Sequence, residues 1–363
     1  MFISKIHLSN FRNFRDKVFA FSPKTTVIVG PNASGKTNIL ESIFLLASGK
    51  SFRARIEEEM INYEEEISRV KGSFTEKKSS NPSKLNLEVV LTRGEIRVGT
   101  AKPERVARKR LLINGVGKRL IDFAGNFRLV LFGPQDLHLV TESPSVRRKF
   151  LDTVLSQVDR EYRRASLSYE KGLRQRNKLL FRIREEGLSR PQLLFWNKLL
   201  IKNGDYISKK RGEFISFVNS TGSLNEQVFS LDYDKSVISE ARFEQYVQEE
   251  IAAATTLVGP HRDDFCFKLK DKKNKKAREL ARYGSRGEQR MSVLWLKLAE
   301  FSFIEDETKE KPALLLDDIF SELDYEHREV VMKAVRGQQT IITVADPHFV
   351  EELERVEKIK LKL

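Results

Sequence analysis

Residues 30–37 read GPNASGKT, a glycine-rich stretch that ends in a lysine and a threonine and fits the pattern G-x-x-x-x-G-K-[ST]. Backbone N–H groups of such a turn converge on phosphate oxygens. Lys36 adds a positive charge for β- and γ-phosphates, and the Thr37 hydroxyl is placed to bind Mg²⁺. The residues expected to contact a nucleotide here are Gly30, Pro31, Asn32, Ala33, Ser34, Gly35, Lys36, Thr37 and Asn38.

A second stretch places two adjacent acids after an apolar run. Residues 313–316 read ALLL and are followed by Asp317 and Asp318, as at the end of a buried strand. We expect Asp317 to hold Mg²⁺ directly or through water, and Asp318 to orient or deprotonate the water that attacks the γ-phosphate. With Lys36, these acids form the predicted catalytic set. Alone the acidic pattern is weak, because any strand that runs into a polar loop can produce it.

The elements around the glycine-rich turn are those that the motif requires. Thr25–Val29 reads as a buried strand, and Asn38–Leu46 carries apolar residues at helical spacing until Gly49 ends the pattern. Open α/β sheets bind ligands at the carboxyl ends of their strands, so the turn and the two acids can meet at one sheet edge. A strand-to-helix turn with an exposed lysine and no ligand is the alternative for the turn taken alone.

The two stretches lie almost 280 residues apart, far more than a compact nucleotide-binding domain needs. We therefore expect an inserted lobe between two halves of one head. The predicted fold is α/β with mixed sheets, in which residues 1–135 and 256–363 form the head and residues 136–255 form a basic helical lobe.

Strands dominate the first third of the chain. An antiparallel pair is expected at residues 5–8 and 17–21, with Val18 and Phe19 packed near the first strand. Clean alternation at residues 85–91 predicts a half-buried strand, and Asn114-Gly115 predicts a tight hairpin turn.

Helical spacing dominates the middle of the chain. The stretch GPQDLHLVTESPS at residues 133–145 is expected to be a loop. Within it, Ser143 and Pro144 mark the start of one long helix that runs to Leu173. Further helices are expected from about Gln192 to Val218 and over 239–254, and a strand over 265–269.

A serine- and glycine-containing turn precedes another amphipathic helix. Residues 285–289 read SRGEQ, and apolar residues follow at helical spacing. A serine hydroxyl, a glycine backbone and a helix N-terminus together make an anion site. The turn resembles the signature turn of ABC-type ATPase heads. That resemblance implies that Ser285, Gly287 and Gln289 belong to a nucleotide site completed by a second copy, so that ATP joins a two-fold dimer. An exposed turn before an amphipathic helix is the alternative.

The net charge of +14 favours a polyanionic partner, and DNA is the natural candidate. Residues 145–184 hold twelve Lys or Arg against four acids, although basic solvated helix faces are also common. No base-reading element is evident, so contacts to phosphates and shape are expected. The candidate DNA contacts are Arg147, Arg148, Lys149, Arg163, Arg164, Lys272 and Lys273.

Other classes of protein fit the sequence poorly. No apolar stretch approaches the length of a membrane span, and the first residues lack the apolar core of a signal peptide, so a cytoplasmic protein without a membrane partner is expected. The single Cys266 makes neither an internal disulfide nor a cysteine metal cluster.

Ten stretches in order along the chain resemble the RecF family of bacterial recombination and replication repair ATPases. They are NFRNF at Asn10, GPNASGKTNILESI at Gly30, SFRAR at Ser51, SPSVRRKFLD at Ser143, LSQVDREY at Leu155, LRQRN at Leu173, GPHRDD at Gly259, SRGEQR at Ser285, LKLAE at Leu296 and LLLDDIFSELD at Leu314. The resemblance implies an ATP-binding protein that dimerises with ATP and Mg²⁺, binds duplex DNA and single-strand/duplex junctions, and hydrolyses ATP slowly. It also implies RecR and RecO as partners that help RecA to load at gaps.

The resemblance also assigns individual residues. Ser321 and Asp324 fall in the D-loop (SELD), Gln135 in the Q-loop, and Asp318 where ABC transporters usually keep a glutamate. His261 and Arg262 fit a structural network beside the signature turn better than a ligand contact.

Two other functions fit the sequence less well. The motor subunit of a transporter is disfavoured by the basic helices, by Asp318 and by the absence of a switch histidine at residues 342–345. A chromosome protein with long coiled-coil arms needs a much longer insert.

Overall fold

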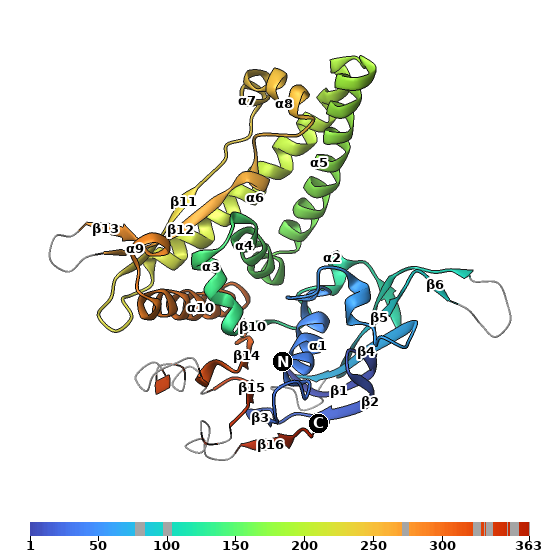
Figure 1. Cartoon of the computed structure of the whole chain (residues 1–363), viewed down its shortest axis with the longest axis vertical. Coiled ribbons are helices and arrows are strands. Elements are labelled where there is room, and N and C mark those ends of the chain that lie inside the picture. Colours follow the sequence, from blue (N-terminus) through green and yellow to red (C-terminus); the bar gives the residue numbers. More distant parts are fainter. Residues whose placement is uncertain are drawn as a thin grey trace. The chain divides into compact units, whose positions relative to one another are not determined.

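The computed structural model describes residues 1–76, 84–96, 104–270, 276–321, 328, 329, 331, 337–346, 348 and 356–362. The chain forms two compact units, one of Met1–Pro134 with Ile304–Leu363 and one of Gln135–Phe303. In Figure 1, the first unit holds the blue N-terminal elements and the red C-terminal strands, and the second holds the green to orange helices. The fold class predicted from sequence is confirmed, and the three-part division stays a prediction.

The first unit contains an antiparallel sheet of order β2-β1-β4-β5-β8-β9. Its strands are β1 (Phe2–Phe11), β2 (Phe14–Ala20), β4 (Ile67–Thr75), β5 (Lys84–Thr92), β8 (Lys109–Ile113) and β9 (Val116–Lys118). The predicted pair at the N-terminus and the predicted strand in β5 are confirmed. Asn114 and Gly115 turn β8 into β9 with φ of 49° and 81°, as the predicted hairpin requires. Phe19 is buried as expected, whereas Val18 is 50% exposed, so the expectation for Val18 is wrong.

The second sheet of this unit is parallel throughout, in the order β10-β14-β15-β3-β16. Its strands are β3 (Thr25–Val29), β10 (Leu129–Phe132), β14 (Ala313–Asp317), β15 (Thr340–Val344) and β16 (Glu357–Lys360). The central strands β14 and β15 are buried at every position, which is typical of a parallel sheet covered on both faces.

Helix α1 (Lys36–Ser48) contacts β4 and β5 of the antiparallel sheet and β14 and β15 of the parallel sheet. Apolar residues on every side of α1 are therefore buried, not only those on the single face expected from the sequence. Gly49 ends α1 with φ of 69°, a left-handed conformation that glycine adopts without strain. The remaining short elements of the unit are η1 (Glu57–Met60), β6 (Glu95–Ile96), β7 (Glu104–Arg105), α2 (Leu120–Phe123) and η5 (Ile319–Ser321).

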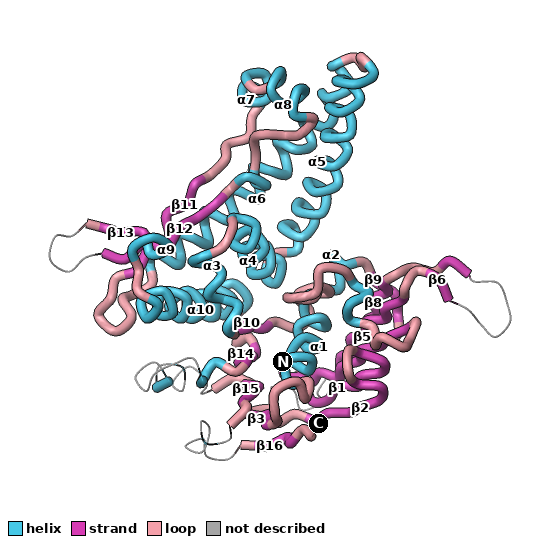
Figure 2. The backbone as a smooth tube through the Cα atoms, in the orientation of Figure 1, coloured by secondary structure: helices cyan, strands magenta, loops and turns pink. Residues whose placement is uncertain are grey.

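The second unit is mainly helical, as the cyan segments of Figure 2 show. Its longer helices are α4 (Pro144–Val158), α5 (Arg160–Glu186), α6 (Leu193–Ser220) and α10 (Arg286–Thr308), the last of which leads back to the first unit. The prediction of a single helix beyond Ser143 is wrong, because the helix is interrupted at Asp159. The Asp159 side chain accepts hydrogen bonds from the backbone N–H groups of Glu161 and Tyr162 and so caps α5. The prediction of α6 is confirmed.

Shorter elements complete the second unit. They are η2 (Pro134–Leu137), α3 (His138–Thr141), η3 (Arg190–Gln192), α7 (Glu240–Gln245), α8 (Val247–Ala253), η4 (Pro260–Arg262), α9 (Leu280–Tyr283) and the antiparallel strands β11 (Phe229–Asp234), β12 (Asp264–Lys270) and β13 (Ala277–Glu279). The predicted strand is confirmed in β12. Two expectations are wrong: residues 134–141 form helical turns, and the helix over 239–254 is interrupted at Tyr246. Among the described residues, no helix combines the length and the apolar character needed to cross a membrane.

Candidate nucleotide site

The glycine-rich turn joins β3 to α1 in a conformation that its sequence dictates. Gly35 has φ of 97°, and a Cβ atom there would lie 2.7 Å from both Asn13 Nδ2 and Phe14 Cζ. Only glycine therefore fits at this position without moving the neighbouring chain. Ala33 also adopts a positive φ, of 67°, which is uncommon for a residue with a Cβ and is found most often at functional sites.

Lys36 and Ser34 show that the turn suits an anionic group. Lys36 Nζ donates to the carbonyl oxygens of Gly30, at 2.7 Å, and Pro31, at 3.0 Å, and its residue is only 7% exposed. The Ser34 hydroxyl is buried and has no hydrogen-bond partner among the described residues. A buried ammonium group and an unsatisfied hydroxyl beside a helix N-terminus fit phosphate oxygens.

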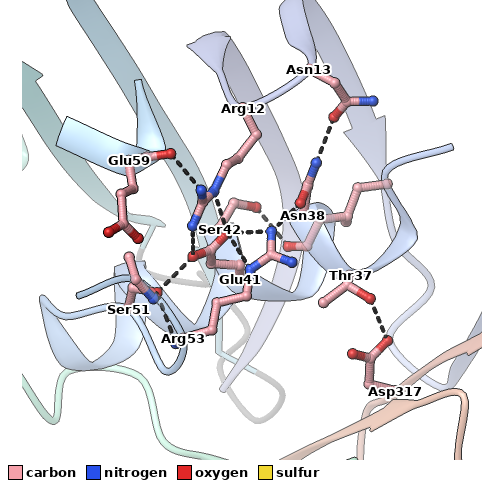
Figure 3. Close-up of polar contacts among 12 residues, drawn as sticks. Arg12, Asn13, Thr37, Asn38, Glu41, Ser42, Ser51, Arg53, Glu59 and Asp317 are labelled. Carbon is pink, nitrogen blue, oxygen red and sulfur yellow. Dashed lines mark hydrogen bonds and ion pairs between the residues drawn. The ribbon is translucent and has the colours of Figure 1, made fainter. Parts of the chain in front are cut away.

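The two predicted halves of the site meet in the first unit. Thr37 Oγ1 donates a hydrogen bond of 3.0 Å to Asp317 Oδ1, across 280 positions of sequence (Figure 3). Strand β15 lies between β3 and β14, so the carboxyl ends of these parallel strands face the same edge. The prediction that the turn and the acids share one sheet edge is confirmed. A hydroxyl beside a carboxylate is the kind of oxygen set that Mg²⁺ prefers.

Thr343, for which the sequence pattern predicts no role at the site, also lies at this sheet edge. Its Oγ1 donates to Asp317 Oδ1 at 2.8 Å and accepts from the backbone N–H of Asp318 at 3.0 Å. Asp318 adopts φ of 49°, a left-handed conformation that aspartate tolerates better than most residues. Thr343 thus fixes both predicted acids. The available signal was a polar residue near the carboxyl end of an otherwise apolar strand.

The predicted signature turn is exposed at the start of α10. Residues 285–287 are all exposed, and a Cβ atom added to Gly287 would have no neighbouring atom of the described residues within 4 Å. Ser285 Oγ accepts from the N–H of Glu288, whose carboxylate accepts from the Ser285 N–H at 2.8 Å, as in a capping box. Gln289 is instead 8% exposed and donates to the Leu280 carbonyl, so it holds the turn from behind.

The remaining predicted nucleotide contacts are Gln135, Ser321 and Asp324. Gln135 lies in η2, which follows β10. Ser321 ends η5, and its side chain, like Asp324, lies outside the described residues.

Several predicted DNA contacts have partners inside the second unit. Arg147 is 8% exposed, and its Nε and Nη2 donate to the two oxygens of Asp264 at 2.6 and 2.9 Å. Arg148 donates to the Asp263 carbonyl, Arg163 to the Ser156 carbonyl, and Arg164 to Glu161. Lys149 is exposed on α4, whereas Lys272 and Lys273 lie outside the described residues.

His261 belongs to a structural network rather than to an exposed site. A carbonyl oxygen can only accept, so His261 Nε2 must donate the 3.0 Å hydrogen bond to the Thr256 carbonyl. In the neutral ring Nδ1 is then the acceptor, and it accepts from the Tyr169 hydroxyl at 2.8 Å. Burial lowers the pKa of His261 to about 4, so the ring is neutral at physiological pH. Arg262 donates to the same Thr256 carbonyl. These contacts favour the structural alternative for both residues.

The parallel sheet, the glycine-rich turn and the acid pair define an ATPase head of the RecF/RecN/SMC class. The family model described as RecF/RecN/SMC N terminal domain matches residues 2–362. The chain belongs to the RecF family. It is 34% identical to the DNA replication and repair protein RecF of Herpetosiphon aurantiacus over 98% of this chain and 97% of that one. It is 35% identical to the protein of the same name from Halalkalibacterium halodurans over 95% and 93%.

Solved structures agree with this assignment. The recombination mediator protein RecF of the RecFOR pathway, solved as RecF-ATPrS, superposes with a TM-score of 0.85 at 30% identity and covers 99% of this chain and 97% of that one. The structure solved as RecF-ATP gives a TM-score of 0.85 at 29% identity, with 99% and 95% covered. An Smc head domain derived from Pyrococcus furiosus gives a TM-score of 0.51 at 15% identity, with 99% and 94% covered, and shares the fold alone.

Proposed function

We propose that this chain is an ATP-dependent DNA-binding protein of recombinational repair and replication. In this proposal ATP drives its dimerisation on duplex DNA or single-strand/duplex junctions, and slow hydrolysis releases it. The observation that carries the proposal is the 3.0 Å contact between Thr37 and Asp317, which closes a nucleotide site from opposite ends of the chain. The names of its relatives, which include RecF-ATP and DNA replication and repair protein RecF, support the nucleotide and the pathway.

Within this site each residue has a distinct task. The N–H groups of the turn and Lys36 hold the phosphates, while Thr37 and Asp317 would hold Mg²⁺, which neutralises charge on the β- and γ-phosphates when it is bound. Asp318 orients the attacking water and accepts its proton. Thr343 keeps Asp317 and Asp318 in place through the hydrogen bonds described above.

Dimerisation would complete the site. The exposed Ser285 and Gly287 of one protomer reach the γ-phosphate held by its partner, and Gln289 supports that turn from within. Gln135, Ser321 and Asp324 are proposed as further nucleotide contacts. By similarity to the RecFOR mediator protein, RecR-type and RecO-type proteins are the proposed partners, and assistance to recombinase loading at gaps is the proposed outcome.

The DNA partner is supported by charge. The chain carries a net charge of +14. Residues 145–184 hold twelve Lys or Arg against four acids, so part of this positive charge is concentrated in the second unit. A concentration of positive charge favours an anion such as the phosphate backbone of DNA.

Sedimentation with and without ATP, Mg²⁺ and a short duplex tests the proposal. The wild type should sediment as a dimer with ATP and should carry the duplex with it. Lys36→Met removes the ammonium group that meets the phosphates and should leave a monomer under the same conditions. Equal dimer populations of wild type and Lys36→Met at saturating ATP would refute the nucleotide-driven step.

A further inference from the structure

A buried carboxylate, Glu41, lies behind the glycine-rich turn and has no part in the chemistry described so far. It lies one turn into α1 and is 0% exposed. Its Oε1 accepts from Arg12 at 2.7 Å and from Ser51 at 2.6 Å, and its Oε2 accepts from Arg12 at 2.9 Å and from Arg53 at 2.8 and 3.1 Å. Figure 3 shows the carboxylate between the two guanidinium groups. Arg12 and Arg53 come from the stretches NFRNF and SFRAR.

The hydrogen bonds of this cluster favour the charged form of the Glu41 carboxylate. Burial alone would raise the pKa of Glu41, but the hydrogen bonds from Arg12, Arg53 and Ser51 outweigh burial and hold the pKa below its ordinary value. One carboxylate faces two guanidinium groups, which leaves an excess positive charge close to the proposed phosphate site. The side chains of Arg12 and Arg53 are 19% and 29% exposed, so the excess is not sealed in the core.

A chain of hydrogen bonds leads from Glu41 to the glycine-rich turn. Arg53 Nη2 donates both to Glu41 and to Asn38 Oδ1, and Asn38 Nδ2 donates to Asn13 Oδ1 at 2.7 Å. Asn13 Nδ2 then donates to the Ser34 carbonyl at 3.3 Å. Asn13 also packs against Gly35, where an added Cβ would collide with its amide. The chain therefore ends on the backbone that is proposed to bind phosphate.

The backbone that carries Arg12 and Asn13 is itself under constraint. Asn10, near the end of β1, and Arg12, in the turn between β1 and β2, adopt φ of 51° and 53°. The Arg12 N–H donates to the Met60 carbonyl at 2.9 Å, and Asn62 Nδ2 donates to the Arg12 carbonyl at 2.7 Å. Positive φ at non-glycine residues costs free energy and persists where the surroundings enforce it, often at functional sites.

From these contacts we infer that Glu41 is a positioning residue for the nucleotide. It fixes Arg53 and Arg12, and through Asn38 and Asn13 it fixes the shape of the glycine-rich turn before the triphosphate arrives. This inference rests on the proposed function. A preorganised turn binds phosphate without reordering its neighbours, so loss of Glu41 should weaken ATP binding more than it slows hydrolysis at saturation.

The test compares Glu41→Gln with Glu250→Gln, a matched control. Glu250 is also 0% exposed and bonded to a buried arginine, Arg176 at 2.6 Å, but it lies in the second unit. Both substitutions should lower the thermal unfolding temperature. Only Glu41→Gln should raise the Kd and KM for ATP, by about tenfold, with kcat at saturating ATP unchanged. An ATP affinity within about twofold of wild type in folded Glu41→Gln would overturn the inference.

Asn13→Ala keeps the test decisive if Glu41→Gln folds poorly. Asn13 is exposed, so its truncation removes the last link to Ser34 at little cost in stability. Asn13→Ala should weaken ATP binding in the same direction, and adding it to Glu41→Gln should produce little further loss, because both act through one chain of contacts. Fully additive losses would overturn the inference. If the wild type binds no ATP, the proposed function is overturned as well. If Lys36→Met loses ATP binding but Glu41→Gln and Asn13→Ala keep it, only the role of Glu41 is overturned.

Discussion

At the residue scale, His261 offers a direct test of the hydrogen-bond network that it forms with Tyr169 and Thr256. Its pKa is about 4 in the folded protein against an ordinary value of 6.5, because burial disfavours the charged ring. Between these values the unfolded chain binds a proton that the folded chain does not, so stability from this group is present above pH 6.5 and is lost as the pH falls toward 4. At pH 5 the expected loss is about 2 kcal/mol.

Urea unfolding of wild type and His261→Gln at pH 7.5 and pH 5 measures this effect. Carboxylates that titrate over the same range are present in both proteins, so the difference between the two isolates the imidazole. The stability advantage of the wild type should shrink by about 2 kcal/mol at the lower pH. An advantage that is the same at both pH values would show that His261 is not buried in its neutral form.

The functional residues that could be predicted are those whose motif lies within one short stretch of sequence. The glycine-rich turn and the two acids each occupy one short stretch, so residue order alone shows their chemistry. Glu41 gave no such signal, because its partners Arg12 and Arg53 meet it only after β1, β2 and residues 51–54 fold against α1. Thr343 depends in the same way on the pairing of β15 with β14. Arg147 was predicted to face DNA, but the sequence does not show that Asp264, far along the chain, pairs with it.

At the element scale, hydrophobic spacing predicted where helices occur but not where they stop. The apolar period continues across Asp159, and so α4 and α5 were expected to be one helix. The missing signal was local, because Asp159 Oδ1 accepts hydrogen bonds from the backbone N–H groups of Glu161 and Tyr162 at 2.8 and 3.1 Å. The other oxygen of Asp159 accepts from the Tyr206 hydroxyl at 2.7 Å. A capping aspartate can therefore end one helix and begin the next without any change in periodicity.

This role predicts the effect of truncating the cap. Asp159→Ala should lower the free energy of unfolding by about 1 to 2 kcal/mol, because two N–H groups and the Tyr206 hydroxyl lose their acceptor. Ser143→Ala is the matched control, since Ser143 stands at the N-cap of α4 but its side chain makes no capping hydrogen bond. The control should cost less than about 0.5 kcal/mol. Equal losses in the two variants, measured by chemical denaturation, would contradict the capping role.

At the scale of the whole molecule, the sequence predicted a basic protein with a divided nucleotide site, and the contact between Thr37 and Asp317 confirms that the divided halves meet. Charge counts could not separate arginines that hold the fold from those that face solvent. Arg147 is held by Asp264, whereas Lys149 is exposed and Arg164 is 48% exposed despite its pairing with Glu161. The informative charge reversals for DNA binding are therefore at Lys149 and Arg164.

Duplex affinity measured over a range of salt concentrations tests this selection. If both side chains contact phosphates, Lys149→Glu and Arg164→Glu should each weaken binding and reduce the slope of log K against log salt by about 1. Lys17→Glu changes the net charge equally at an exposed position of β2 in the first unit, and it should leave the slope unchanged. Equal losses in all three variants would mean that the positive charge acts as a general field around the molecule. Arg147→Gln should instead lower stability, because Asp264 would lose its partner, and any weaker DNA binding would follow the fraction of folded protein.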